Sequence, residues 1–198
     1  MEHKLGEITL DELFGGYELI NKPASKLPQD VASAVGIVNG GLLGATYQPI
    51  FYVGKQAVNG MNHMLICEEI RTTKNRSKAI VALIINIPPG EGAARGENAR
   101  VVRIVEEADM PENVQAIFSA AEKQLIGVSY KPVAYIGSQV VRGVNHYFVC
   151  EARVIYPGAE PRAVIMGVNV FDNNVSIVGI MPIGSTEASG PLGYAFTW

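Results

Sequence analysis

The sequence is poor in charge. Only 18% of its 198 residues are charged, whereas a typical soluble domain carries about 25%. The formal net charge is −3, from 19 acidic and 16 basic residues. This balance excludes a nucleic-acid-binding protein that relies on broad positive charge. With 48% hydrophobic residues, the chain also lacks the low hydrophobicity and high net charge that are typical of disorder.

Long apolar runs are missing as well. No stretch approaches the roughly 18 consecutive apolar residues of a membrane helix, so we expect no membrane partner. Residues 1–6 are mostly polar and do not form the hydrophobic region of a signal peptide. The localisation therefore stays open between a cytoplasmic protein and a secreted protein whose signal has been removed.

Residues that carry chemistry are few. The chain has two cysteines and three histidines, and two cysteines make no disulfide framework. We find no nucleophile elbow, metal-ligand cluster or nucleotide-binding motif in the sequence. We therefore expect a protein that is not an enzyme and that holds neither a cofactor nor a metal ion.

What the sequence does contain is an internal repeat. Residues 42–68 align without gaps to residues 125–151, 83 positions later, with 13 identities in 27 positions. A period of this length, present twice, indicates the tandem duplication of a small domain rather than a solenoid. We predict four segments, which are an N-terminal arm (1–14), a first repeat (15–106), a second repeat (107–186) and a C-terminal tail (187–198).

Each repeat shows the same order of expected elements. Pro28 and Pro111 each open an apolar segment with helical spacing. Segments rich in β-branched and aromatic residues follow, separated by turn residues. The expected strands are 47–58, 61–72, 78–87 and 100–106, then 130–141, 144–155, 163–171 and 175–183. The prediction is an α+β fold of two tandem units, each with one helix packed on a curved antiparallel sheet of about four strands.

The pentapeptide Gln-x-Val-x-Gly occurs between the first two expected strands of both repeats. It spans Gln56–Gly60 in the first repeat and Gln139–Gly143 in the second. Its place after a helix resembles the first hairpin of the cystatin family of cysteine peptidase inhibitors. Gly15-Gly16-Tyr17 resembles the Gly-Gly-aromatic segment near cystatin N-termini. The resemblance covers about residues 15–183 and suggests two tandem cystatin-like repeats.

The resemblance implies a function. In inhibitory cystatins, the N-terminal segment, the first hairpin and a second hairpin form a wedge that enters the active-site cleft of papain-like cysteine peptidases. The implied partner is therefore a peptidase of that class. The positions that match the three parts of the wedge are Gly15, Gly16, Gln56, Val58, Gly60, Pro88, Pro89 and Gly90 in the first repeat, and Gln139, Val140, Val141 and Gly143 in the second.

The match is uneven between the repeats. The second repeat has no glycine segment before its helix, and residues 172–174 replace the Pro-Gly loop of the first repeat. Conversely, the loop after Gly90 is longer than a cystatin hairpin requires. Because the second repeat lacks both the glycine segment and the Pro-Gly loop, we expect the first repeat to be the stronger inhibitor. The alternative is a structural or protein-interaction module with no inhibitory activity, in which the pentapeptide only maintains a hairpin.

A second repeated pattern pairs a histidine with a cysteine four residues later, as His63/Cys67 and His146/Cys150. On a strand, four residues span about 13 Å at roughly 3.3 Å each. One such pair cannot bind a single metal ion or form a thiolate–imidazole couple. We expect a buried cysteine and a hydrogen-bonded histidine on one face of the strand.

Two expectations concern how the repeats meet. The place of a first strand in the second repeat overlaps residues 101–105, which the first repeat needs as its last strand, so the tail 193–198 is a candidate extra strand. Two small units have proportionally more surface than one large domain. The low charge therefore predicts that the repeats pack on each other, and it leaves a homo-oligomer open.

Overall fold

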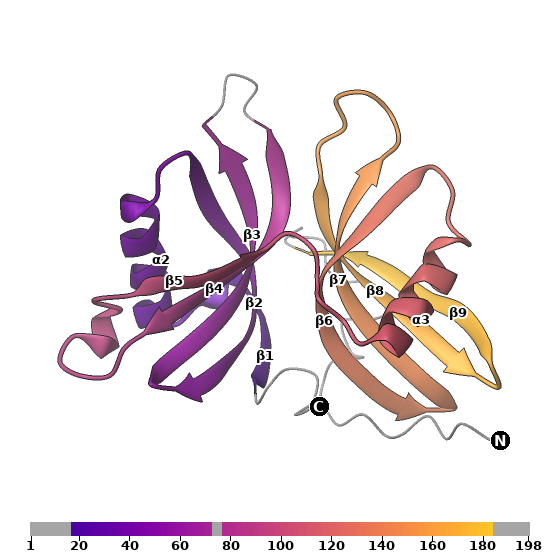
Figure 1. The fold of residues 1–198 in the computed structure, drawn as a ribbon, viewed down its shortest axis with the longest axis horizontal. Helices are drawn as coiled ribbons and strands as arrows, with labels where there is room; N and C mark the ends of the chain where they lie inside the picture. The colour runs from indigo at the N-terminus through magenta and orange to yellow at the C-terminus, as the bar shows by residue number, and fades with distance from the viewer. Residues whose placement is uncertain (1–16, 73–76, 184–198) are drawn as a thin grey trace.

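The structure is a computed structural model, and it describes residues 17–72 and 77–183. Within these residues, nine β-strands form two antiparallel sheets, and two α-helices accompany them. In Figure 1 the two sheets stand side by side, with α2 on the outer side of one and α3 on the outer side of the other. The predicted arm (1–14) and tail (187–198) lie outside the described residues.

The first sheet has five strands in the order in which they occur along the chain. Helix α2 (Gln29–Gly41) follows the first strand, and the short 3-10 helices η1 (Ala24–Lys26) and η2 (Ala93–Arg95) lie in connections. The strands are β1 (Glu18–Pro23), β2 (Ala45–Val58), β3 (Gly60–Arg71), β4 (Lys78–Ile87) and β5 (Arg100–Val105).

The second sheet has four strands, again in chain order. Helix α3 (Glu112–Glu122) precedes it. The strands are β6 (Val128–Val141), β7 (Gly143–Val154), β8 (Arg162–Phe171) and β9 (Asn174–Pro182). The eight strands expected from the sequence are therefore confirmed, with bounds that differ by at most two residues at either end.

Proline begins both helices. Pro28 and Pro111 are the N-cap residues, and Asp30 and Glu112 lie in the first turns, where a carboxylate interacts favourably with the helix dipole. Each helix buries an apolar stripe against its own sheet. The buried residues are Val31, Ala34, Val35 and Val38 in α2, and Val114, Phe118 and Ala121 in α3.

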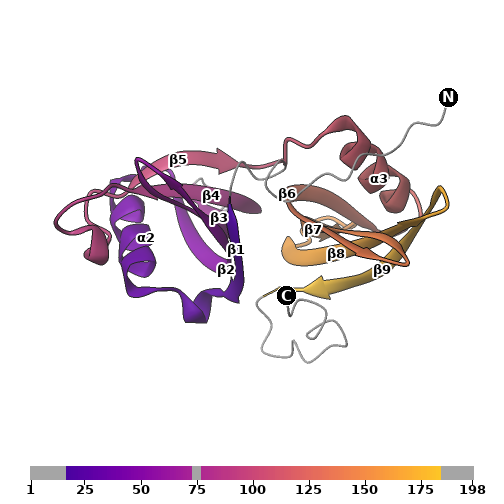
Figure 2. The same cartoon turned by 90° about the horizontal axis from the view of Figure 1, so that it is seen from below.

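A third core lies between the two sheets. It joins residues from β2, β3 and β4 to residues from β6, β7 and β8, so each sheet is covered by a helix on one face and by the other sheet on the opposite face (Figure 2). Its fully or nearly buried members include Val53, Ile66, Ile80, Val133 and Val149.

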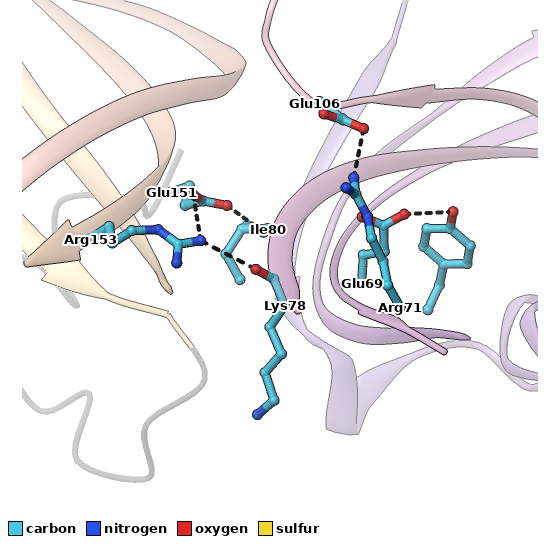
Figure 3. A network of polar contacts seen from close by, with 8 residues as sticks. Glu69, Arg71, Lys78, Ile80, Glu106, Glu151 and Arg153 are labelled. Carbon is cyan, nitrogen blue, oxygen red and sulfur yellow. Dashed lines mark hydrogen bonds and ion pairs between the residues drawn. The ribbon is translucent and has the colours of Figure 1, made fainter. Parts of the chain in front are cut away.

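Polar contacts cross the same interface (Figure 3). The backbone N–H of Ile80 donates to Oε2 of Glu151 at 2.8 Å. Arg153 donates to the carbonyl oxygen of Lys78 at 3.2 Å and to Oε1 of Glu151 at 3.2 Å. Because Glu151 is 8% exposed, its carboxylate connects the two sheets from a nearly water-free position.

The predicted α+β fold class is wrong. The part of the chain that the structure describes is dominated by sheet, with 55% in strands and 18% in helices, and the first sheet has five described strands instead of about four. Two causes account for the difference. The hairpin strands β2 and β6 each run for 14 residues, whereas each helix has 13 residues or fewer. In addition, the central core is built from sheet packed on sheet, which the helix-on-sheet prediction did not include.

The second sheet has no described counterpart of β1. At that edge, β6 makes one backbone hydrogen bond to the connection between the repeats, from Ala108 N to Pro132 O at 2.8 Å. The candidate strand 193–198 lies outside the described residues. No α-helix in the described part of the chain has the length and apolarity that crossing a bilayer requires.

Candidate functional site

The two Gln-x-Val-x-Gly segments form tight hairpin turns. In the first sheet Gly60 faces Val58 across the turn, and in the second sheet Gly143 faces Val141. Both glycines have positive φ, +93° and +90°, a conformation that glycine adopts at little cost. Both hairpins lie at the lower edge of the molecule in Figure 1, one on each side of the interface.

In the first sheet, the hairpin and the Pro-Gly loop lie side by side. A Cβ atom added to Gly60 would overlap the carbonyl oxygen of Ile87 and crowd the Cα of Pro88. Strand β1 reaches the same end, because Glu18 pairs with Lys55. The described parts of the predicted wedge are therefore neighbours, whereas Gly15 and Gly16 lie outside the described residues.

The tips are accessible to a partner. Val58 is 48% exposed, and Pro89 and Gly90 are exposed next to a half-buried Pro88. In the second sheet Val140 and Val141 are 73% and 44% exposed. Here the neighbour of the hairpin is the β8–β9 turn, since a Cβ on Gly143 would overlap the carbonyl oxygen of Val170.

The glutamine of the first motif takes part in a ladder of side-chain amides. Asn62 Nδ2 donates to Oε1 of Gln56 at 3.1 Å, and Asn86 Nδ2 donates to Oδ1 of Asn62 at 3.0 Å. Asn86 also donates to the carbonyl oxygen of Asn59, inside the turn, at 3.4 Å. The ladder connects three strands and holds the half-buried Gln56 in the sheet.

The second sheet repeats the ladder with a tyrosine inserted. Asn169 Nδ2 donates to Oδ1 of Asn145 at 2.7 Å and to the carbonyl oxygen of Arg142 at 3.3 Å. Asn145 Nδ2 donates to the hydroxyl of Tyr147, which donates to Oε1 of Gln139. Sequence reasoning did not assign a role to Asn86 and Asn169, although their recurrence at the 83-residue offset was a usable signal.

The repeated histidines bond to repeated tyrosines. Tyr52 Oη and His63 Nδ1 lie 2.7 Å apart, and Tyr135 Oη and His146 Nδ1 lie 2.8 Å apart. Burial lowers the pKa of both histidines. Cys67 and Cys150 are buried free thiols, and burial raises the pKa of each. The expected buried cysteine and hydrogen-bonded histidine are confirmed in both repeats.

Sequence comparisons assign no family. No protein-family model matches the chain, and no curated protein matches its sequence. The observations that bear on function are therefore the repeat, the resemblance of its motifs to those of cystatins and the geometry of the hairpins. Among the described residues, no group of three or more His, Cys, Asp or Glu side chains is placed to hold a metal ion.

Proposed function

We propose that the protein is a non-enzymatic, cystatin-like inhibitor of papain-like cysteine peptidases. In this proposal the Gln56–Gly60 hairpin and the Pro88–Gly90 loop of the first repeat enter the active-site cleft of the peptidase. The observation that carries the proposal is their contact at one exposed end of the first sheet, where Gly60 lies against Ile87 and Pro88.

The hairpin is prepared for binding before it meets a partner. The ladder from Gln56 through Asn62 to Asn86 fixes the turn by bonding to its carbonyl oxygen at Asn59. A loop that is already ordered loses little conformational entropy on association, which favours affinity. The tip then presents the exposed side chain of Val58 and backbone groups to an extended cleft.

The second repeat supports a weaker wedge. Its hairpin is accessible at Val140 and Val141, but its neighbour is the tight β8–β9 turn at Asp172 and Asn173, both of which have positive φ. The second repeat therefore contributes one hairpin and no extended Pro-Gly loop. The expected order of inhibitory strength is first repeat, then second.

Titration of several papain-like peptidases with the full chain tests the proposal. Val58→Asp should weaken inhibition by roughly 100-fold or more, because an unpaired carboxylate would be buried in the complex. Val141→Asp is the matched control, since Val141 occupies the same place in the second repeat and is similarly exposed. Gly60→Ala should likewise weaken inhibition more than Gly143→Ala. No inhibition at micromolar concentration, or equal loss from the two aspartate variants, would disprove the proposal.

The ladders also favour a second candidate, a structural or protein-interaction module with no inhibitory activity. In both repeats the motif glutamine is bonded within its own sheet, so the motif has a structural role that requires no peptidase. This alternative predicts that Gln56→Ala lowers thermal stability and that wild-type protein inhibits none of the peptidases.

A further inference from the structure

The long loop of the first repeat covers the start of α2. After Pro88 the chain continues through η2, and Gly96 lies so close to the helix that an added Cβ would overlap the carbonyl oxygen of Asp30 and crowd the amide of Ala34. Gly96 also has a positive φ of +68°. The loop and the first turn of α2 border, with β2 and β3, an open cleft of about 410 Å³.

Most of the cleft wall is apolar. Cavities of about 300–1,000 Å³ with apolar walls and a few convergent polar groups are typical binding sites for small molecules. The cleft of the first repeat is within this range of size. Its apolar lining includes Ile20, Met61, Ile87, Pro88, Pro89 and Ala93.

A buried imidazole supplies the first polar group. His63 lines the cleft and is 5% exposed. Its Nδ1 is occupied by the hydroxyl of Tyr52 at 2.7 Å. Its Nε2 has no hydrogen-bond partner in the part of the chain that the structure describes. One nitrogen of a nearly buried ring is thus available to a ligand.

Two opposite charges accompany the imidazole. Asp30 and Lys55 also line the cleft. Burial is the main cause that lowers the pKa of His63. Asp30 raises this pKa and Lys55 lowers it, so both charges act on the imidazole. They do not pair with each other. Lys55 Nζ lies 3.3 Å from the largely exposed carboxylate of Glu18, and the carboxylate of Asp30 accepts a hydrogen bond from the amide of Val31.

The second repeat lacks both charges. Eighty-three positions later, Asn113 replaces Asp30 and Ser138 replaces Lys55. The tyrosine–histidine pair is nevertheless retained as Tyr135 and His146. The pair therefore belongs to the fold of each repeat, whereas the carboxylate and the ammonium occur only in the repeat that has the cleft-forming loop.

We propose that this cleft binds an apolar α-amino acid as its zwitterion. Asp30 receives the α-ammonium group, and Lys55 together with the Nε2–H of His63 binds the α-carboxylate. The ligand side chain packs on the apolar wall. This assignment matches one positive and one negative ligand group to the opposite charges beside His63, and it does not depend on peptidase inhibition.

Nuclear magnetic resonance of the full chain with L-leucine and L-phenylalanine tests the site. The chain has three histidines, so its imidazole signals can be resolved individually. Saturable shifts of the His63 ring are expected at up to millimolar ligand, with His146 as an internal reference that does not move. Absence of saturable shifts, or equal shifts at both rings, would overturn the proposal.

Truncated ligands and variants test the two charges separately. Leucinamide lacks the carboxylate and 4-methylpentanoate lacks the ammonium, and each should bind about 10- to 100-fold more weakly than leucine, as expected for a lost hydrogen bond to a charged group. Asp30→Asn and Lys55→Ser, which introduce the residues of the second repeat, should weaken leucine binding to a similar extent. Asn113→Ala is the matched control and should change nothing. Equal binding of leucine, leucinamide and 4-methylpentanoate to wild-type protein would show apolar adsorption only and would refute the site. This comparison needs no variant, so it remains decisive if a variant folds poorly.

Discussion

The two repeats solve the same packing problem with different side chains. Against the first sheet, α2 places Val35 over a core that contains Leu65, whereas α3 places Phe118 edge-on against Phe148, with the ring centroids 5.2 Å apart. Both aromatic positions lie 83 residues after their aliphatic counterparts. The comparison shows that the shared part of the repeat is the hairpin and its polar ladder, while the helix contact has diverged.

The largest expected effect tests this difference in helix packing. Phe118→Ala should lower the free energy of unfolding by about 3–5 kcal/mol, because it leaves a large cavity beside Phe148. Val35→Ala, the matched change in the first repeat, should cost about 2 kcal/mol, since it removes fewer buried groups. Urea unfolding of the two variants measures both values. Equal losses would mean that α3 is no more strongly anchored than α2.

The next effect concerns the contact between the sheets. Glu151→Ala should cost about 2–3 kcal/mol, because it leaves the buried amide of Ile80 without its acceptor. Glu68 is the equivalent residue of the first repeat, and its partly exposed side chain pairs with Lys78. Glu68→Ala should therefore cost less than about 1 kcal/mol. Thermal unfolding of both variants decides the point, and similar losses would contradict a special role for Glu151 in joining the sheets.

A smaller difference is expected for the amide ladders. Asn86 is 2% exposed, whereas Asn169 is half-buried. Asn86→Ala should therefore cost about 2 kcal/mol and Asn169→Ala about 1 kcal/mol, because water can replace lost hydrogen bonds only at the second site. Amide hydrogen exchange at the two turns provides an independent measurement. Asn86→Ala should accelerate exchange around residue 59 more than Asn169→Ala accelerates it around residue 142, and the reverse order would show that the tyrosine-containing ladder is the stronger one.

The smallest expected effect is on pH dependence. Because burial lowers the pKa of His63 and His146, the unfolded chain binds more protons than the folded chain near the ordinary histidine pKa of about 6.5. Stability should therefore fall as the pH drops through that value. Asp30→Asn should lower the pKa of His63 further, since it removes a carboxylate that raises it, and should leave His146 unchanged. Imidazole titrations measure both shifts, and an equal change in the two rings would argue against a local effect of Asp30.

The sequence predicts the positions of the strands better than it predicts how the two sheets pack on each other. Alternation, turn residues and the repeat locate the hairpins to within two residues, because these are local properties of the chain. The contact between the sheets depends on which apolar face meets which, and that is a long-range property. The sequence of β4 did indicate this contact, because residues 80–87 are almost all apolar, as expected for a strand covered on both faces. In the structure most of these residues are buried.

The site shows the same limit. The hairpin residues from Gln56 to Gly60 are adjacent in sequence, so their shared location follows from the motif. The charges of the cleft come from α2 and β2, and only the fold brings Asp30 and Lys55 to the same cavity. Comparison of the repeats could have drawn attention to them, because both charges are lost at the matching positions Asn113 and Ser138.

The core between the sheets has a consequence for biosynthesis. Synthesis proceeds from the N-terminus, so the apolar face that includes Val53, Ile66 and Ile80 leaves the ribosome before residues 133–165, which later cover it. During that interval the face is open to chaperones or to another nascent copy of the chain. The first repeat therefore keeps an uncovered apolar face until the second repeat has been synthesised. A translational pause within residues 106–132 would prolong the period in which aggregation competes with folding.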